Sequence, residues 1–76
     1  MNDTELKNKA INWLEKQSKI CKTRPYPFRP KEVADAILGA YTALGRVAKE
    51  VVAELEARGV KARYVQQGNK RFFELL

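Results

Sequence analysis

The chain has no histidine and only one cysteine, Cys21, among its 76 residues. A single cysteine excludes an internal disulfide, and the lack of histidine removes both Cys/His zinc sites and the commonest general base. No glycine-rich phosphate loop is present either. We therefore expect no metal, no cofactor and no enzyme activity. Cys21 continues the apolar face of a predicted helix, which favours a buried thiol over a reactive one beside Lys19 and Lys22.

Long apolar runs are also missing, because none approaches the roughly 20 residues that a membrane-spanning helix requires. The N-terminal residues mix acids with bases and lack the apolar centre of a secretory signal peptide. A chain of 76 residues buries one small core and leaves little room for an enclosed pocket. The sequence thus predicts a single soluble, cytoplasmic domain over residues 1–76 with no membrane partner.

Acidic residues are scarce relative to basic ones, nine against 15, so the net charge is +6. The charges are also segregated. Residues 16–31 hold six basic residues and no acid. A second basic cluster near the C-terminus consists of Arg58, Lys61, Arg63, Lys70 and Arg71. Segregated positive charge favours a polyanionic partner, although a merely soluble basic surface is the simpler alternative.

Helical periodicity predicts three helices, which span residues 3–18, 30–38 and 42–58. Asp3 or Thr4 is expected to cap the first helix, and Thr42 the third. Gly39 is expected to supply a left-handed turn between the second and third helices, and Gly59 a left-handed end to the third. The short second helix and the longer third helix have the arrangement of a helix-turn-helix unit.

Three extended segments are predicted around these helices. The prolines of residues 23–30 favour a short edge strand. Residues 60–65 and 70–75 are predicted to form a hairpin, with Gln67, Gly68 and Asn69 as its turn. The expected fold class is therefore α+β, in the order helix, strand, helix, helix, strand, strand, with a three-helix core and a C-terminal hairpin.

Apolar residues at helical spacing identify the core. On the first helix they are Leu6, Ala10, Trp13 and Leu14, and on the third helix Leu44, Val47, Ala48, Val51 and Leu55. Trp13 is expected in the core rather than stacked on a nucleic-acid base, because its neighbours on that face are apolar. Ile11, Leu75 and Leu76 leave two alternatives open. They either form the seam of a homodimer or complete the core of a monomer.

Three stretches of the chain resemble the parts of winged helix-turn-helix proteins. VADAIL corresponds to the positioning helix, TALGRVAKEVVAELEARGV to the recognition helix and KARYVQQGNKRFFEL to the wing. In size and basic character the chain is similar to small DNA-binding proteins encoded by archaeal viruses and plasmids. The usual turn glycine comes one residue late, at Gly39. The resemblance implies a transcriptional regulator that places residues 42–58 in the major groove of double-stranded DNA and residues 60–75 on the backbone or minor groove.

The exposed side of the third predicted helix carries the candidate base-reading residues. These are Thr42, Arg46, Lys49 and Ala53, flanked by Gly45 and Glu50. Arg46 is able to donate two hydrogen bonds to guanine, and Lys49 to contact a base or a phosphate. The small residues Gly45 and Ala53 allow close approach to base edges. An ordinary solvated helix face accounts for the same stripe equally well.

The predicted hairpin adds further candidate contacts to DNA. Lys70 and Arg71 are expected at phosphates, and Gln67 or Asn69 in a minor groove. Tyr41, ahead of the third helix, either closes the core or donates its hydroxyl to a phosphate. Lys31, from the first basic cluster, completes the predicted interface.

Two other functions fit the same sequence, namely a protein-interaction module and a non-specific architectural nucleic-acid binder. Sequence-specific DNA reading predicts that Arg46→Ala costs roughly 1 to 3 kcal/mol on a preferred site. An architectural binder predicts equal losses on all sequences from Lys70→Ala and Arg71→Ala. An interaction module predicts no effect of Arg46→Ala and no steep salt dependence.

Overall fold

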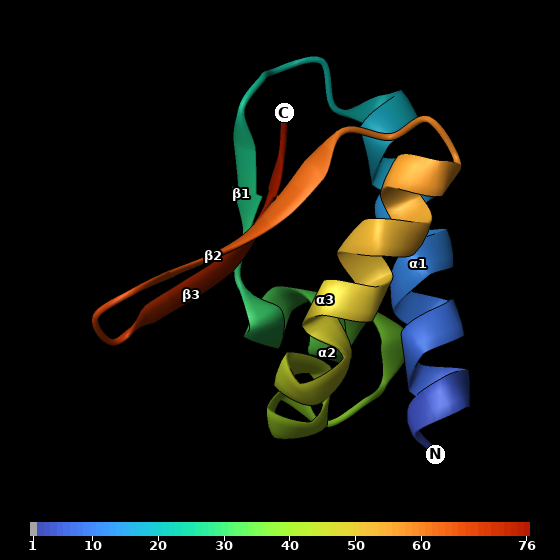
Figure 1. Ribbon diagram of the computed structural model, residues 1–76, viewed down its shortest axis with the longest axis vertical. Coiled ribbons are helices and arrows are strands. Elements are labelled where there is room, and N and C mark those ends of the chain that lie inside the picture. Colours follow the sequence, from blue (N-terminus) through green and yellow to red (C-terminus); the bar gives the residue numbers. More distant parts are fainter. Residues whose placement is uncertain (1) are drawn as a thin grey trace.

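Three helices and three strands follow one another in the predicted order (Figure 1). The structure is a computed structural model that describes residues 2–76. The helices are α1 (Asp3–Ile20), α2 (Pro30–Ile37) and α3 (Tyr41–Ala57), and the strands are β1 (Tyr26–Phe28), β2 (Ala62–Gln67) and β3 (Lys70–Leu75). The mixed α+β class and the order of elements are thus confirmed.

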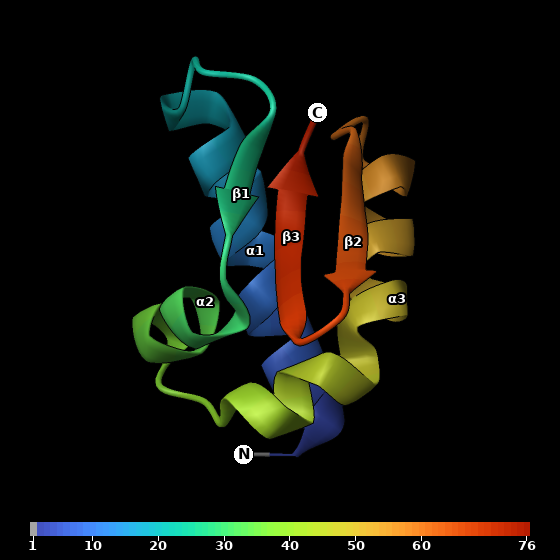
Figure 2. The ribbon, with the colours of Figure 1, turned by 90° about the vertical axis from the view of Figure 1, so that its left-hand side faces the viewer.

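Strand β3 is the centre of one antiparallel sheet with the order β1-β3-β2, and Figure 2 shows α1 and α3 behind that sheet. Strands β2 and β3 form the predicted hairpin, but β2 extends to Gln67, which pairs with Lys70. Gln67 therefore belongs to the strand and not to the turn as predicted. The loop contains only Gly68 and Asn69, and Gly68 has the positive φ of 58° that a tight hairpin favours.

Strand β1 covers only part of the other edge of β3. Its three residues pair with the last part of β3, from Tyr26 opposite Leu75 to Phe28 opposite Phe73. Pro30 then begins α2, because its fixed φ suits the first turn and its missing N–H leaves no helix bond unmade. Residues 70–72 of β3 consequently have no strand partner on the β1 side.

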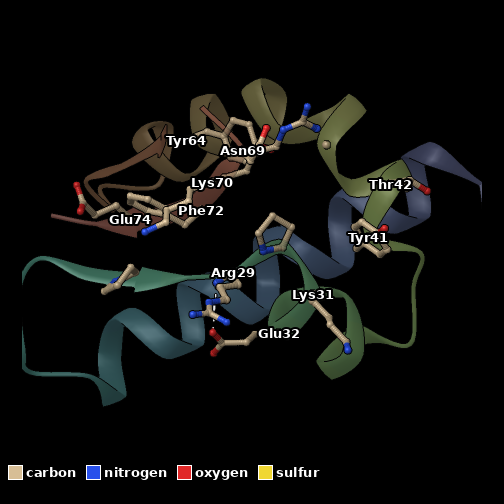
Figure 3. A pocket seen from close by; sticks show the side chains of 14 residues that line it. Arg29, Lys31, Glu32, Tyr41, Thr42, Tyr64, Asn69, Lys70, Phe72 and Glu74 are labelled. Atoms are coloured by element: carbon tan, nitrogen blue, oxygen red, sulfur yellow. Dashed lines mark hydrogen bonds between the residues drawn. The ribbon is translucent and has the colours of Figure 1, made fainter. Parts of the chain in front are cut away.

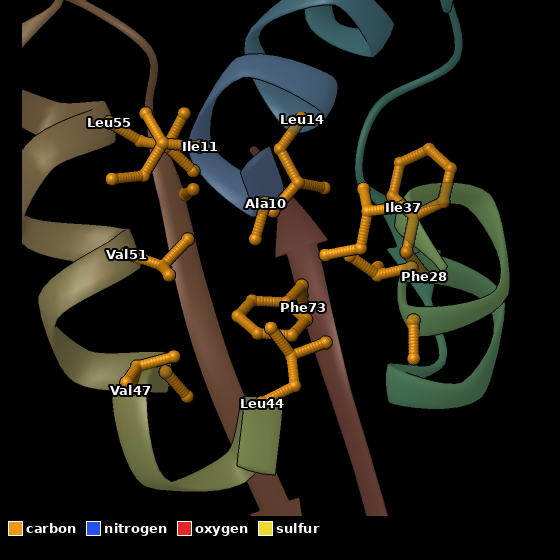
Figure 4. Close-up of a cluster of buried hydrophobic side chains, with 14 of the residues drawn as sticks. Ala10, Ile11, Leu14, Phe28, Ile37, Leu44, Val47, Val51, Leu55 and Phe73 are labelled. Atoms are coloured by element: carbon orange, nitrogen blue, oxygen red, sulfur yellow. The ribbon is translucent and has the colours of Figure 1, made fainter. Parts of the chain in front are cut away.

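Apolar side chains from every helix and every strand meet in one core (Figure 4). All of the apolar residues predicted on α3 are buried, as are Leu6, Ala10 and Leu14 of α1. Trp13 is half-buried and packs on this core, where its ring meets Phe28 edge to face at 5.2 Å between centroids. Trp13 therefore lies at the edge of the core and is not one of its fully buried residues. Cys21 is half-buried rather than fully buried.

The candidate seam residues separate into two groups. Ile11 and Leu75 are each only 1% exposed, because both lie in the core of this single chain. Leu76 is 45% exposed. Ile11 and Leu75 therefore complete the monomer and offer no surface to a second copy.

Both predicted N-caps differ from those observed. Helix α1 is capped by Asn2, whose Oδ1 accepts a hydrogen bond from the backbone N–H of Glu5 at 2.8 Å. Helix α3 begins at Tyr41 after Ala40, which has no side-chain oxygen with which to cap it. Thr42 is thus the second residue of the helix rather than its cap, because α3 begins at Tyr41, one residue before the predicted start.

The turn between α2 and α3 also departs from the prediction. Leu38, not Gly39, has the left-handed conformation, with φ of 58°. Gly39 serves a different purpose, since a Cβ at that position would lie 2.5 Å from Cδ1 of Leu6 on α1. The glycine therefore allows α1 to pass close to this turn. At the far end of α3, Gly59 has φ of 82°, as predicted for a left-handed helix end.

Candidate functional site

A groove of about 820 Å³ opens between the start of α2, the first turns of α3 and the hairpin (Figure 3). Its lining consists of Pro27, Arg29, Pro30, Lys31, Glu32, Tyr41, Thr42, Gly45, Tyr64, Asn69, Lys70, Arg71, Phe72 and Glu74. The groove exists because β1 ends before it reaches residues 70–72 of β3, and the chain turns away into α2. Three segments that are distant in sequence thereby face a common space.

Four basic side chains border this groove, namely Arg29 and Lys31 from the start of α2 and Lys70 and Arg71 from β3. All four are exposed to solvent. Within residues 2–76, none of them forms an ion pair with a carboxylate. Their positive charge is therefore available to a ligand and not neutralised inside the protein.

Two carboxylates line the groove, those of Glu32 and Glu74, and each accepts a hydrogen bond within the protein. Oε1 of Glu32 accepts a hydrogen bond from the backbone N–H of Arg29 at 3.4 Å, drawn as a dashed line in Figure 3. Oε1 of Glu74 accepts a hydrogen bond from Nε of Arg63 at 2.6 Å, across the β2–β3 pair. Glu74 is thereby neutralised by a cation outside the groove lining. The field inside the groove is consequently dominated by its cations.

The remaining walls are aromatic or small. Tyr41 is the first residue of α3, is 59% exposed and lines the groove instead of closing the core. Phe72 is half-buried on the outer side of β3. Gly45 leaves open space on α3, because a Cβ there would have only the hydroxyl of Tyr64 nearby, at 3.9 Å. A ligand backbone is thus able to approach α3 closely at Gly45.

Seven of the residues predicted from the sequence line this one groove. They are Lys31, Tyr41, Thr42, Gly45, Asn69, Lys70 and Arg71. The other predicted residues are exposed but lie outside its lining, with Gln67 at the end of β2 and Arg46, Lys49, Glu50 and Ala53 farther along α3. The structure thus gathers the hairpin and the first turn of α3, and leaves the rest of the predicted stripe on the neighbouring surface.

Arg46 lies on the flank of α3 that faces α1. Its Nη2 atom is 3.2 Å from Oδ1 of Asp3, and the Arg46 side chain is 62% exposed. An ion pair at such an exposed position contributes at most about 1 kcal/mol, because water and salt screen it. Arg46 is therefore held by Asp3 only weakly.

Several groove residues were not predicted from the sequence, including Arg29, Pro27, Tyr64 and Phe72. Arg29 belongs to the first basic cluster, but nothing in the sequence places the N-cap of α2 opposite β3. Tyr64 and Phe72 lie on strands, and strand alternation by itself does not place either of them at a groove. Their place in the groove follows from how far β1 extends.

Within residues 2–76, no helix is long and apolar enough to span a membrane, and no three acidic or cysteine side chains gather as a metal site would require. The sequence matches no protein-family model, and it has no significant similarity to curated proteins or to solved structures. Any function must therefore be argued from the geometry and chemistry described above.

Proposed function

We propose that this protein is a winged helix-turn-helix domain that binds double-stranded DNA and regulates transcription. In this proposal α2 and α3 are the helix-turn-helix unit, α3 is the recognition helix and the β2–β3 hairpin is the wing. The first turns of α3 and the hairpin line the same groove, which is consistent with such an arrangement. The element order and the hairpin support this assignment.

The observation that carries the proposal is the set of four basic side chains around one groove. Arg29 and Lys31 come from the start of α2 and Lys70 and Arg71 from β3, and none of them is paired with an acid among the described residues. Four unpaired positive charges around one space attract anions. Phosphates of a nucleic-acid backbone supply such anions in a row.

The recognition helix supplies the groups that would contact bases. Thr42 and Lys49 lie on the exposed side of α3, and Gly45 and Ala53 keep that side slim enough to approach base edges. Arg46 joins them by exchanging its contact with Asp3 for guanine O6 and N7. This exchange costs little because the ion pair is exposed.

A second candidate function is supported by the apolar part of the groove. Pro27, Pro30, Tyr41 and Phe72 offer flat apolar surfaces beside the cations. Such a surface also suits an extended acidic peptide, as in a protein-interaction module. Competition shows whether the two ligands share a site, because a short duplex displaces a bound peptide only if both bind the same cations.

An amide-resolved NMR titration of the labelled protein with a pool of duplex DNA at moderate salt tests the proposal. We expect shifts at residues 42–53, at residues 67–71 and at Arg29 and Lys31, with none at residues 15–24. Shifts that also cover residues 15–24 would indicate non-specific attraction to the basic surface. If no amide moves even at low salt, DNA is not the ligand, and the same titration with an acidic peptide tests the second candidate.

A further inference from the structure

A second, shallower groove of about 440 Å³ lies between α1 and α2. Lys9, Asn12, Trp13 and Lys16 of α1 form one wall, and Ala36, Ile37 and Leu38 form the other. None of these residues lines the first groove. The surface is therefore separate from the proposed DNA interface, and the inference drawn from it does not depend on DNA binding.

Leu38 is the most informative residue of this second groove. The residue is 88% exposed, and its backbone has the left-handed conformation that β-carbon sterics disfavour. Neither core packing nor backbone geometry accounts for a leucine at this position. A glycine or asparagine would serve the turn better. An exposed leucine at a strained position points to contact with another molecule.

The end of α3 shows what the same turn looks like without this strain. There the N–H of Gly59 donates to the carbonyl of Glu56 and the N–H of Val60 to that of Leu55, at 3.0 and 2.8 Å. At the end of α2 the equivalent donors are Leu38 and Gly39, which bond to the carbonyls of Asp35 and Ala34 at 3.4 and 2.8 Å. The two hydrogen-bond patterns match. Only the residue in the left-handed position differs.

The charges around the second groove define its partner. No carboxylate lines it, whereas Lys9 and Lys16 stand two helical turns apart on α1, or about 10 Å. Lys16 has no ion pair within residues 2–76, and Lys9 has only an exposed contact of 3.7 Å with Glu5. The exposed carboxylate of Asp35 lies on α2 outside the lining. Acids spaced one heptad apart on a helix would match the two lysines.

We propose that the α1–α2 groove binds an acidic amphipathic helix of a partner protein. The apolar face of that helix packs on Leu38 and on the exposed part of Trp13, and its carboxylates pair with Lys9 and Lys16. The groove has an aromatic ring between two lysines along α1 and an exposed leucine on the opposite wall, which suits the side of a helix better than a flat membrane surface. This interaction would attach the domain to another protein while the first groove stays open.

Fluorescence provides a direct test, because Trp13 is the only tryptophan of the chain. The probe is a synthetic 18-residue helix with leucines at positions i, i+3, i+4 and i+7 and glutamates one heptad apart. We expect saturable blue-shifted Trp13 emission. A scrambled peptide of the same composition should leave the emission unchanged. Equal responses to both peptides, or none to either, would overturn the proposal.

Two variants locate the contact. Leu38→Asn should weaken peptide binding about tenfold while leaving the thermal midpoint equal or raised by a few degrees, since asparagine tolerates the left-handed turn. Lys16→Glu should weaken binding by a similar factor, but Lys61→Glu, the same charge change on an exposed residue outside both grooves, should not. Unchanged affinity in Leu38→Asn would reject the proposal. So would an emission shift produced by anionic lipid vesicles but not by the peptide, which would identify a membrane surface.

Discussion

Basic residues on the two sides of α3 are in opposite circumstances. On the flank toward α1, Arg46 pairs with Asp3, and Arg58 contacts Asn12 at 3.0 Å and Glu15 and Glu54 at 3.4 Å. On the flank toward the hairpin, Lys70 and Arg71 border a groove with no acid paired to them in residues 2–76.

This difference separates basic residues that hold the fold together from basic residues that are available to a ligand. Helices α1 and α3 pack along much of their length, so acids on α1 lie within reach of the arginines of α3. On the edge of β3 away from β2, the strand β1 ends early, and the space it leaves is lined by cations and aromatic rings. Net charge alone does not distinguish these two roles.

Removing the hairpin cations should have the largest effect. We expect the double variant Lys70→Ala, Arg71→Ala to bind a duplex on the order of 10- to 100-fold more weakly, and the slope of log K against log salt to fall by about 2, because two phosphate contacts are lost. Fluorescence anisotropy with a labelled duplex at several salt concentrations measures both. The control is Lys19→Ala, Lys22→Ala, which removes the same charge from residues outside the groove. An equal loss in the control would mean that only net charge matters.

Arg46 tests whether the α1 flank also contributes to recognition. Arg46→Ala should cost roughly 1 to 3 kcal/mol on a preferred site and little on other sequences, because a bidentate contact to guanine is lost. Binding to duplexes selected from a random pool measures this difference. Asp3→Asn, which releases Arg46 without removing it, should not weaken binding. If the loss in Arg46→Ala is the same on every sequence, Arg46 does not read a base.

Arg58 should behave as a structural cation. Arg58→Ala is expected to lower the free energy of unfolding by about 1 kcal/mol, since its partly buried guanidinium links α3 to α1 but remains screened by solvent. Urea denaturation measures the loss, and DNA affinity should stay unchanged. A fall in affinity without a change in stability would reverse the assignment of the two flanks.

Gly45 should show the smallest effect, with opposite signs for stability and binding. Gly45→Ala has room for its methyl group, because the nearest atom is 3.9 Å away, and should stabilise α3 by about 0.5 to 1 kcal/mol. The same methyl group narrows the groove and should weaken duplex binding. Thermal denaturation and anisotropy on the one variant measure both quantities. Tighter binding together with higher stability would show that the ligand does not approach α3 at Gly45.

Much of the local structure was predictable because it depends on residues that are close in sequence. The apolar face of α3, Pro30 at the start of α2 and Gly59 at the end of α3 all follow from helical spacing and backbone sterics. The hairpin followed from alternation around Gly68. The errors lie at boundaries. At α1 the neighbouring residues Asn2, Asp3 and Thr4 are all chemically able to cap, and at α3 the helix begins after Ala40, which has no capping side chain.

The candidate site was predictable only in part. Lys70, Arg71 and Thr42 were identified by residue type and by their position on the hairpin and helix. Arg29 and Phe72 were not, because their place in the groove depends on where β1 ends relative to β3. Which cations form ion pairs was also not predictable from the sequence, because an ion pair such as that of Arg46 with Asp3 joins residues far apart in the chain.

The sequence by itself determined the α+β class, the order of elements and most of the core, because helical and strand periodicity reflect which side chains must leave water. Tertiary structure alone decided that Ile11 and Leu75 belong to the monomer, that Gly39 makes room for α1, and that Leu38 takes the strained turn. It also decided which cations are paired. These properties depend on distances between segments, and local periodicity carries no information about those distances.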